Sequence, residues 1–316
     1  MKRSGFLTFL LSLGLLGVAG GALGALLAGR HDLLDLIGMF AAPALTCAVI
    51  GVALALLLRR WKLALGYALA GLALFLCLRP QWFPQAPSAA PEAEPVRVYF
   101  ANVWAGNRET DAIAASVHAA EADVVALVEI TDEHAAALDR ILKDHPYRAS
   151  TRPARFFRGG PRVVIAAKWP VKEAYLGLQD GLAVGDTVVS TPQGELRVIA
   201  AHLTRPWPMD GRRGEQRRQA DRLARRITGG QADRVLVVGD FNATGSSDVL
   251  RDFASQARLS PAPARLGTWP RQLPGVFRIA IDNAFAGPGL AIVSRELGQA
   301  NGSDHRPIVV EVAPAR

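Results

Sequence analysis

Residues that could carry out acid, base or metal chemistry stand at the ends of short apolar runs in the last two thirds of the chain. The clearest case is Gly239-Asp240-Phe241-Asn242, which directly follows the β-branched, apolar run 235–238. That run predicts a strand buried on both faces, and alternate residues of an extended chain point to the same side. Asp240 and Asn242 would therefore lie together at a strand end. Alone, this motif fits a catalytic rim and a simple Asx turn equally well.

Other expected strands meet polar residues in the same way. They are residues 96–101 before Asn102, 123–128 before Glu129, 195–201 before His202 and 279–281 before Asp282. A closing strand over residues 307–312 instead begins just after Asp304 and His305, and an antiparallel direction would bring both to the same rim. Each residue alone could be a turn cap, a solvated strand end or a core histidine. Their repetition at six strand ends predicts one shared site.

The residue types at these strand ends fit a single chemistry. Glu129, Asp304 and Asn102 offer hard oxygen donors, which suit Mg²⁺ or Mn²⁺ better than zinc. The remaining members could hold phosphate oxygens, polarise a water or orient an imidazole, and they are His202, His305, Asn242, Asp240 and Asp282. The chain has no P-loop, serine elbow or HExxH motif, and its two cysteines, Cys47 and Cys77, lie in apolar N-terminal stretches. Metal-assisted chemistry on an anionic substrate is the expectation.

Helical patterns alternate with these strands. The expected helices cover residues 111–120, a segment capped by Thr131 and running to about Lys143, and the basic segment 213–227, with a further strand at 163–167. Strands and helices mixed in this way predict an α/β or α+β layered domain. The domain is expected to span residues 96–316, after a Pro-rich linker at 81–95.

The first 80 residues predict a membrane anchor of three transmembrane helices, at about 6–28, 36–58 and 61–79. On the side of the membrane where the N-terminus lies, the basic residues are Lys2, Arg3, Arg59, Arg60 and Lys62. On the opposite side they are Arg30 and Arg79. This excess predicts a cytoplasmic N-terminus, and three spans then predict a multi-pass inner-membrane protein with an extracytoplasmic catalytic domain. Much of the formal charge of +8 belongs to these flanks, so it is weak support for nucleic-acid binding.

The motif set resembles the endonuclease/exonuclease/phosphatase superfamily. The resemblance rests on Asn102, Glu129, Ala201-His202-Leu203, Gly239-Asp240-Phe241-Asn242, Asp282 and Gly302-Ser303-Asp304-His305-Arg306-Pro307, in that order along the domain. It implies a deoxyribonuclease-like, four-layer α/β/β/α sandwich with the site at one end of two packed sheets. It also implies a Mg²⁺-dependent (or Mn²⁺-dependent) hydrolase that acts on phosphoester bonds.

The resemblance further implies a role for each site residue. Glu129 would be the principal metal ligand, assisted by Asn102 and Asp304. Asp240 would position the attacking water, with Asn242 beside it. His305 would contact the scissile phosphate, oriented by Asp282, and His202 would stabilise the transition state from the other side. Two positions depart from common family patterns, since Trp104 stands where some nucleases carry an acid, and Asn283 replaces the histidine of an Ile-Asp-His motif.

The membrane anchor shapes the expected substrate. A site tethered at a membrane meets lipid phosphates at high effective concentration, and anchored bacterial relatives with this layout resemble polyprenyl-pyrophosphate phosphatases. The leading expectation is a lipid-linked, extracytoplasmic phosphoester, with membrane lipids as partners. A membrane-anchored nuclease is the alternative, and an inactive binding domain is a third. Two arginine groups, at 205–226 and at 152–162, are either solvated or available to a polyanion, while aromatic residues for base stacking are sparse there, so nucleic acid remains an unsupported partner.

Overall fold

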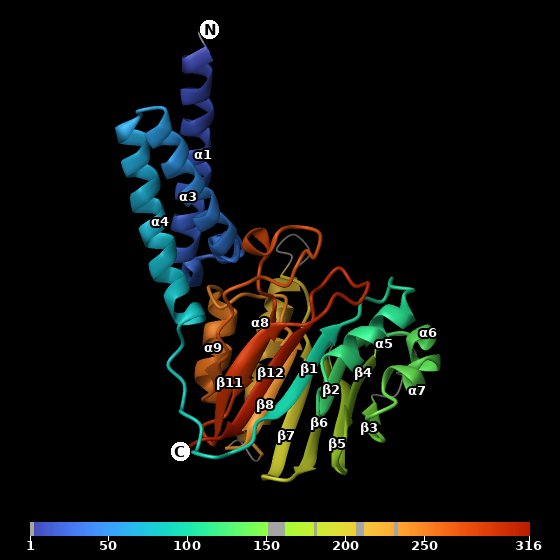
Figure 1. Ribbon diagram of the computed structural model, residues 1–316. Coiled ribbons are helices and arrows are strands. Elements are labelled where there is room, and N and C mark those ends of the chain that lie inside the picture. Colours follow the sequence, from blue (N-terminus) through green and yellow to red (C-terminus); the bar gives the residue numbers. More distant parts are fainter. Residues whose placement is uncertain (1–2, 151–161, 180–181, 207–211, 231–232) are drawn as a thin grey trace.

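The computed structural model describes residues 3–150, 162–179, 182–206, 212–230 and 233–316. Apolar helices form a bundle at one end of a β-sandwich (Figure 1). The bundle contains α1 (Arg3–Leu26), α2 (Asp32–Gly38), α3 (Ala41–Leu57) and α4 (Trp61–Trp82). Its contacts depend on small residues, since a side chain at Gly51 would collide with the Tyr67 ring.

Three parts of this bundle are candidates to cross a membrane. Among the described residues, α1 and α4 are long and apolar enough by themselves, and α2 with α3 forms a third candidate that is bent by 58°. The sequence predicted one span over 36–58 with a tolerated Pro43. The chain instead breaks at Met39 and Phe40, and the short α2 is bent away from the axis of α3 and packs against α1.

Within the described residues the sandwich consists of two six-stranded sheets. The first has the order β11-β12-β1-β2-β4-β3, with β1 (Val96–Asn102), β2 (Val124–Ile130), β3 (Tyr147–Ser150), β4 (Arg162–Ala167), β11 (Leu290–Leu297) and β12 (Ile308–Pro314). The second has the order β5-β6-β7-β8-β10-β9, with β5 (Val171–Gln179), β6 (Leu182–Thr191), β7 (Gly194–His202), β8 (Val235–Asp240), β9 (Ser260–Pro261) and β10 (Asp282–Ala286).

Helices cover the outer face of each sheet. The first sheet is covered by α5 (Thr110–Ala119), α6 (Asp132–Ala136) and α7 (Leu138–Ile141), and the second by α8 (Arg212–Thr228) and α9 (Asp248–Ala257). Apolar residues of both sheets, among them Val98, Phe100 and Val238, fill the space between them. The continuous apolar runs are therefore strands buried on both faces. The expected four-layer α/β/β/α sandwich is confirmed.

Strand direction explains why the polar residues meet. β1 runs parallel to β2, and β7 runs parallel to β8, so their C-terminal ends lie at one rim. β12 is antiparallel to β1, and its start therefore lies at the same rim, as the sequence predicted for Asp304 and His305.

One strand prediction was wrong. Residues 279–281 do not form a strand that ends at Asp282, because β10 begins at Asp282 and runs antiparallel to β8. Ile279 and Ile281 instead pack against Met39 of the bundle. Asp282 still reaches the rim, since the antiparallel register places it directly opposite Asp240.

Other segments differ in extent. The helix expected from Thr131 to about 143 splits at Ala137 into α6 and α7, although Thr131 does cap it as expected. α4 continues past Pro80 to Trp82, so the segment without regular structure begins at Phe83 rather than at 81. Strands β3, β5, β6, β9 and β11 and helix α9 were not predicted from the sequence.

Candidate active site

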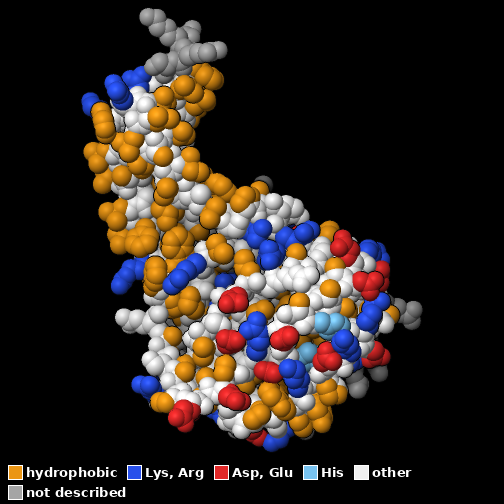
Figure 2. Space-filling model, viewed as in Figure 1, with side chains coloured by type: hydrophobic (Ala, Val, Ile, Leu, Met, Phe, Trp, Pro, Cys, Tyr) orange, Lys and Arg blue, Asp and Glu red, His pale blue; other side chains and the backbone are white. Residues whose placement is uncertain are grey.

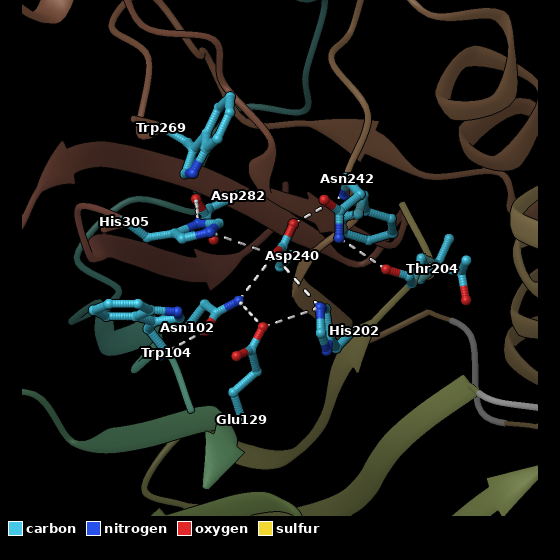
Figure 3. Close-up of polar contacts among 12 residues, drawn as sticks. Asn102, Trp104, Glu129, His202, Thr204, Asp240, Asn242, Trp269, Asp282 and His305 are labelled. Carbon is cyan, nitrogen blue, oxygen red and sulfur yellow. Dashed lines mark hydrogen bonds and ion pairs between the residues drawn. The ribbon is translucent and has the colours of Figure 1, made fainter. Parts of the chain in front are cut away.

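Asp240 lies at the centre of the rim (Figure 3). Its side chain is buried, with 1 % of the residue exposed. Asn102 Nδ2 donates hydrogen bonds to Asp240 Oδ2 and to Glu129 Oε1, both at 2.9 Å. Asp240 Oδ1 accepts a hydrogen bond from the backbone N–H of Asn242 at 2.9 Å. The amide of Asn102 thus links the two carboxylates across the ends of the two sheets.

The backbone around these residues is strained. Trp104, Glu129 and Asn242 have φ values of 61°, 61° and 47°, in the left-handed region that side chains disfavour. Glu129 lies within an irregularity of the β2–β4 pairing, and its Oε2 accepts a hydrogen bond from Ala105 N at 2.9 Å. Such conformations persist where surrounding contacts hold them, and they concentrate at functional sites.

Two imidazoles lie on either side of Asp240. His202 Nε2 is 3.5 Å from Glu129 Oε1 and 3.6 Å from Asp240 Oδ2. His305 Nε2 is 3.8 Å from the same Asp240 oxygen. Figure 3 shows the two rings approaching from opposite sides.

His305 forms a close pair with Asp282. Its Nδ1 lies 2.8 Å from Asp282 Oδ2, and both side chains are buried. Burial alone would lower the pKa of His305, but the carboxylates of Asp282 and Asp240 outweigh it and raise the pKa to about 10. The ring is therefore a cation at neutral pH, with Nε2 directed toward the centre of the site.

The pKa of Asp240 is shifted upward by its burial, while the neighbouring His305 cation opposes that shift. A buried carboxylate beside a cationic imidazole is suited to accept a proton during a reaction. The raised pKa of Asp240 comes from its burial in the fold, which its place at a strand end in the sequence does not reveal.

Asp304 differs from the sequence expectation. The structure gathers Glu129, His202 and Asp240 into one possible metal-binding group, and Asp240, Asp282 and His305 into another, and Asp304 belongs to neither. Asp304 Oδ2 accepts a hydrogen bond from Trp269 Nε1 at 3.0 Å. Its Oδ1 is buried without a hydrogen-bond partner and lies 4.0 Å from His305 Nε2.

The oxygen atoms at the rim fit a hard divalent cation. The carboxylates of Glu129 and Asp240 lie close enough to share one ion, and the buried Asp304 Oδ1 without a partner is a further donor on the His305 side. The site thus holds the oxygen-rich set that Mg²⁺ or Mn²⁺ prefers.

Three supporting residues were not predicted from the sequence. Gln216 Nε2 donates to Phe241 O and to Asn242 O, both at 3.0 Å. Gln219 is bonded to the N–H and the hydroxyl of Thr204, just after His202. Trp269 holds Asp304. The available signal was the placement of Gln216 and Gln219 on the apolar face of α8, where buried amides need partners.

Two arginines of α8 form ion pairs with acidic residues that do not belong to the rim. Arg217 pairs with Asp248 and Asp252, while Arg226 pairs with the buried Asp186. Arg152, Arg155 and Arg158 lie outside the described residues, as do Trp207 and Phe156–Phe157. The solvated or structural interpretation holds for these pairs in α8.

Solved structures with the same architecture support the fold. An endonuclease/exonuclease/phosphatase from Bacteroides vulgatus is 16 % identical, with a TM-score of 0.58, and covers 70 % of this chain and 99 % of its own. Staphylococcus aureus beta toxin with bound magnesium ions is 17 % identical, with a TM-score of 0.52 and coverage of 69 % and 99 %. D. rerio TDP2, complexed with a single-strand DNA product, is 15 % identical, with a TM-score of 0.55 and the same coverage. At these identities the likeness shows the fold.

A search of curated protein sequences found no match. The family model described as Endonuclease/Exonuclease/phosphatase family matches residues 100–305, which include every rim residue described above. Members of this family are metal-dependent hydrolases of phosphoester bonds. With its rim and its sandwich in place, the chain belongs to the endonuclease/exonuclease/phosphatase family.

Proposed function

We propose that this protein is a membrane-anchored, Mg²⁺-dependent phosphoesterase that cleaves a lipid-linked phosphate ester or anhydride at the extracytoplasmic face of the inner membrane. One observation carries the proposal: the rim with the site is the end of the sandwich that faces the base of the apolar bundle (Figure 1). A lipid headgroup would reach this rim without leaving the bilayer.

The bundle supports the membrane assignment. Figure 2 shows apolar side chains over its visible surface. Its far end carries Arg59 and Arg60 between α3 and α4, Lys62 in the first turn of α4, and Arg3 at the start of α1. The positive-inside rule would place that end in the cytoplasm and the sandwich outside. In this assignment residues 1–80 are the anchor, 81–95 the linker and 96–316 the catalytic domain.

Contacts at the bundle base support the orientation of the rim. Asp35 of α2 accepts hydrogen bonds from Ser247 Oγ and from Asp248 N, at 2.9 and 2.7 Å. Gln81 of α4 pairs with the backbone of Ala264 in both directions. These bonds, buried at the junction, hold the sandwich in one orientation relative to the helices.

The mechanism uses the rim as a set of fixed polar groups. Glu129 and Asp240, assisted by Asn102 and Asp304, would hold a divalent cation, which supplies charge neutralisation of the phosphate and of the leaving oxygen. Asp240, beside Asn242, would orient the attacking water and accept its proton. The His305 cation, held by Asp282, would donate a hydrogen bond to a phosphate oxygen. His202 would bind the developing charge from the opposite side.

The test is a substrate panel with the full chain in lipid nanodiscs and Mg²⁺. The panel contains polyprenyl pyrophosphate, phospholipids and plasmid DNA. We expect phosphate or headgroup release from lipid, and its loss in Glu129→Ala and His305→Ala. Nicking of DNA without lipid turnover would reject the lipid substrate, and activity that survives both substitutions would reject the site.

A second function, an anchored nuclease, is favoured by one feature. Trp104 follows the rim residue Asn102, is 45 % exposed, and could stack on a base. A DNA-cleaving activity that falls in Trp104→Ala, with lipid turnover absent, would support this alternative.

A further inference from the structure

The loop formed by residues 264–278 lies between the bundle and the active site. It leads from β9 to the residues before β10, and its short helical turn at Gly275–Phe277 sits beside the base of the bundle (Figure 1). Its sequence contains three arginines and no acidic residue. The exposed side chains of this loop have no role in the mechanism proposed above.

Apolar side chains of this loop are exposed. Leu266, Leu273 and Val276 have 45 %, 43 % and 49 % of their surface accessible. Phe40 and Phe83, at the ends of the bundle helices nearest the sandwich, are similarly exposed. These side chains continue the apolar surface of the bundle onto the catalytic domain, as expected where a protein meets a membrane.

The same loop concentrates positive charge. Arg265, Arg271 and Arg278 belong to it, and Arg306 lies close by. Their side chains donate hydrogen bonds to backbone carbonyls, and within the described part of the chain none of the four forms an ion pair with a carboxylate. Burial and the repulsion of Arg306 and Arg271 lower the pKa of Arg278. The cluster therefore has positive charge that acidic side chains of the described residues do not neutralise.

Hydrogen bonds to the bundle fix the position of the loop along the axes of α3 and α4. Thr46 Oγ1, in the early turns of α3, donates to Val276 O at 2.9 Å, and Ala264 N donates to Gln81 O at 3.0 Å. The loop is thus held at the level where α3 begins and α4 ends. In a bilayer crossed by these helices, that level is the headgroup region.

Other bonds tie the loop to the active site. Trp269 holds the Asp304 side chain, Arg271 N donates to Asp304 O at 2.7 Å, and Arg271 Nε donates to Ser303 O at 2.6 Å. Hydrogen bonds therefore join the 264–278 loop directly to the active-site rim.

We propose that the 264–278 loop rests on an anionic lipid surface, with Leu266, Leu273 and Val276 at the apolar boundary and Arg265 and Arg278 against lipid phosphates. The inference depends on the proposed function only in placing the bundle in a bilayer. The contact fixes the loop, and with it Asp304, at the membrane surface. Basic residues beside anionic lipids gain electrostatic attraction, and the apolar side chains gain burial.

The test places an environment-sensitive fluorophore on the loop of the full chain. Leu273→Cys is labelled in a Cys47→Ala, Cys77→Ala background, and the protein is reconstituted in nanodiscs of phosphatidylcholine, alone or in an equal mixture with phosphatidylglycerol. We expect a blue shift and quenching by nitroxide-labelled lipids, both stronger in the anionic discs. Leu69→Cys, exposed in the middle of α4, is the membrane-inserted control, and Glu195→Cys, at the opposite end of β7, is the solvent control.

Charge variants complete the experiment. Arg265→Glu should reduce quenching at position 273 to the level of the neutral discs, and Arg265→Lys should retain it. Arg225→Glu, which reverses an exposed arginine near the far end of α8, should change nothing. Quenching at 69 without quenching at 273 would overturn this inference and leave the anchor intact. Absence of quenching at 69 would instead overturn the membrane assignment itself.

Discussion

Asp282 determines the charge of His305. The pair is buried, with 2.8 Å between Nδ1 and the carboxylate oxygen, and the raised pKa of His305 depends on Asp282 and Asp240 against the effect of burial. Without Asp282, burial favours the neutral ring, which cannot donate from both nitrogens at neutral pH.

Asp282→Asn tests this role. We expect hydrolysis at neutral pH to fall by about 10²-fold or more, as is typical when a positioned acid–base group is lost. Activity should recover in part as the pH is lowered, because the variant's His305, with its lower pKa, is then protonated again. Asp221→Asn, at a residue on α8 away from the rim, is the control. A loss that is equal at every pH would show that Asp282 acts only on the position of His305.

His145 predicts a pH dependence of stability. Its Nε2 lies 2.9 Å from Ala122 O, its Nδ1 is buried without a partner, and burial lowers its pKa below the ordinary 6.5. The unfolded chain therefore binds a proton at higher pH than the folded one, so stability is lost as pH falls from about 6.5 toward the lower folded pKa. Chemical denaturation of wild type and His145→Gln across this range should show a smaller pH slope in the variant. Equal slopes would contradict the assignment.

Residue types at strand ends predicted most of the candidate site because strand direction brings most of these residues together, although Asp282 lies at the start of β10 and not at the end of the expected strand 279–281. Asn102, Glu129, His202, Asp240 and Asp282 meet at one rim, and the antiparallel β12 delivers His305. The hydrogen bond that Asp304 accepts from Trp269 could not be predicted, since Trp269 comes from a loop without sequence pattern.

At the scale of elements, α8 supports the rim through hydrogen bonds to its backbone. Gln216 donates to the backbone carbonyls of Phe241 and Asn242, and it is 1 % exposed. Its removal leaves buried acceptors without this donor, and such losses cost about 1–3 kcal/mol.

Gln216→Ala should therefore lower the free energy of unfolding by about that amount, and it should also reduce turnover, because Asn242 loses its support. Gln256→Ala, which removes an exposed contact with Asp221, is the matched control and should change neither. Denaturant titration and steady-state rates measure the two effects. Destabilisation with full activity would mean that the rim keeps its geometry without the hydrogen bonds from Gln216.

β6 shows why whole strands escaped prediction. Asp186 lies in its middle, which argues against a buried strand, yet Asp186 accepts hydrogen bonds from Arg197 at 2.9 and 2.8 Å and from Arg226 at 2.8 Å. A buried carboxylate is tolerated when its partners are present. Those partners come from β7 and α8, so a local sequence window does not contain them.

At the scale of the whole molecule, the short helix α2 joins the helical bundle to the β-sandwich. The sequence predicted a continuous span over 36–58, but α2 turns away and uses Asp35 to cap α9. The side chain of Ser247, at the N-cap position of α9, makes no capping bond to that helix. The helical bundle therefore supplies, through Asp35, the N-terminal cap of a sandwich helix more than 200 residues away in sequence.

Asp35→Ala tests whether this junction orients the site. Loss of a helix cap costs about 1–2 kcal/mol, and the buried Ser247 hydroxyl loses its acceptor. The sandwich should then move more freely at the bundle base, so turnover of substrate in nanodiscs should fall while turnover of a soluble phosphodiester stays near the wild-type rate. Asp32→Ala, at an exposed position of the same helix, is the control. Faster amide exchange over residues 247–251 in Asp35→Ala would locate the change at α9. An equal fall in both rates would show that Asp35 contributes only to the stability of the fold. The orientation of the rim would then not depend on this junction.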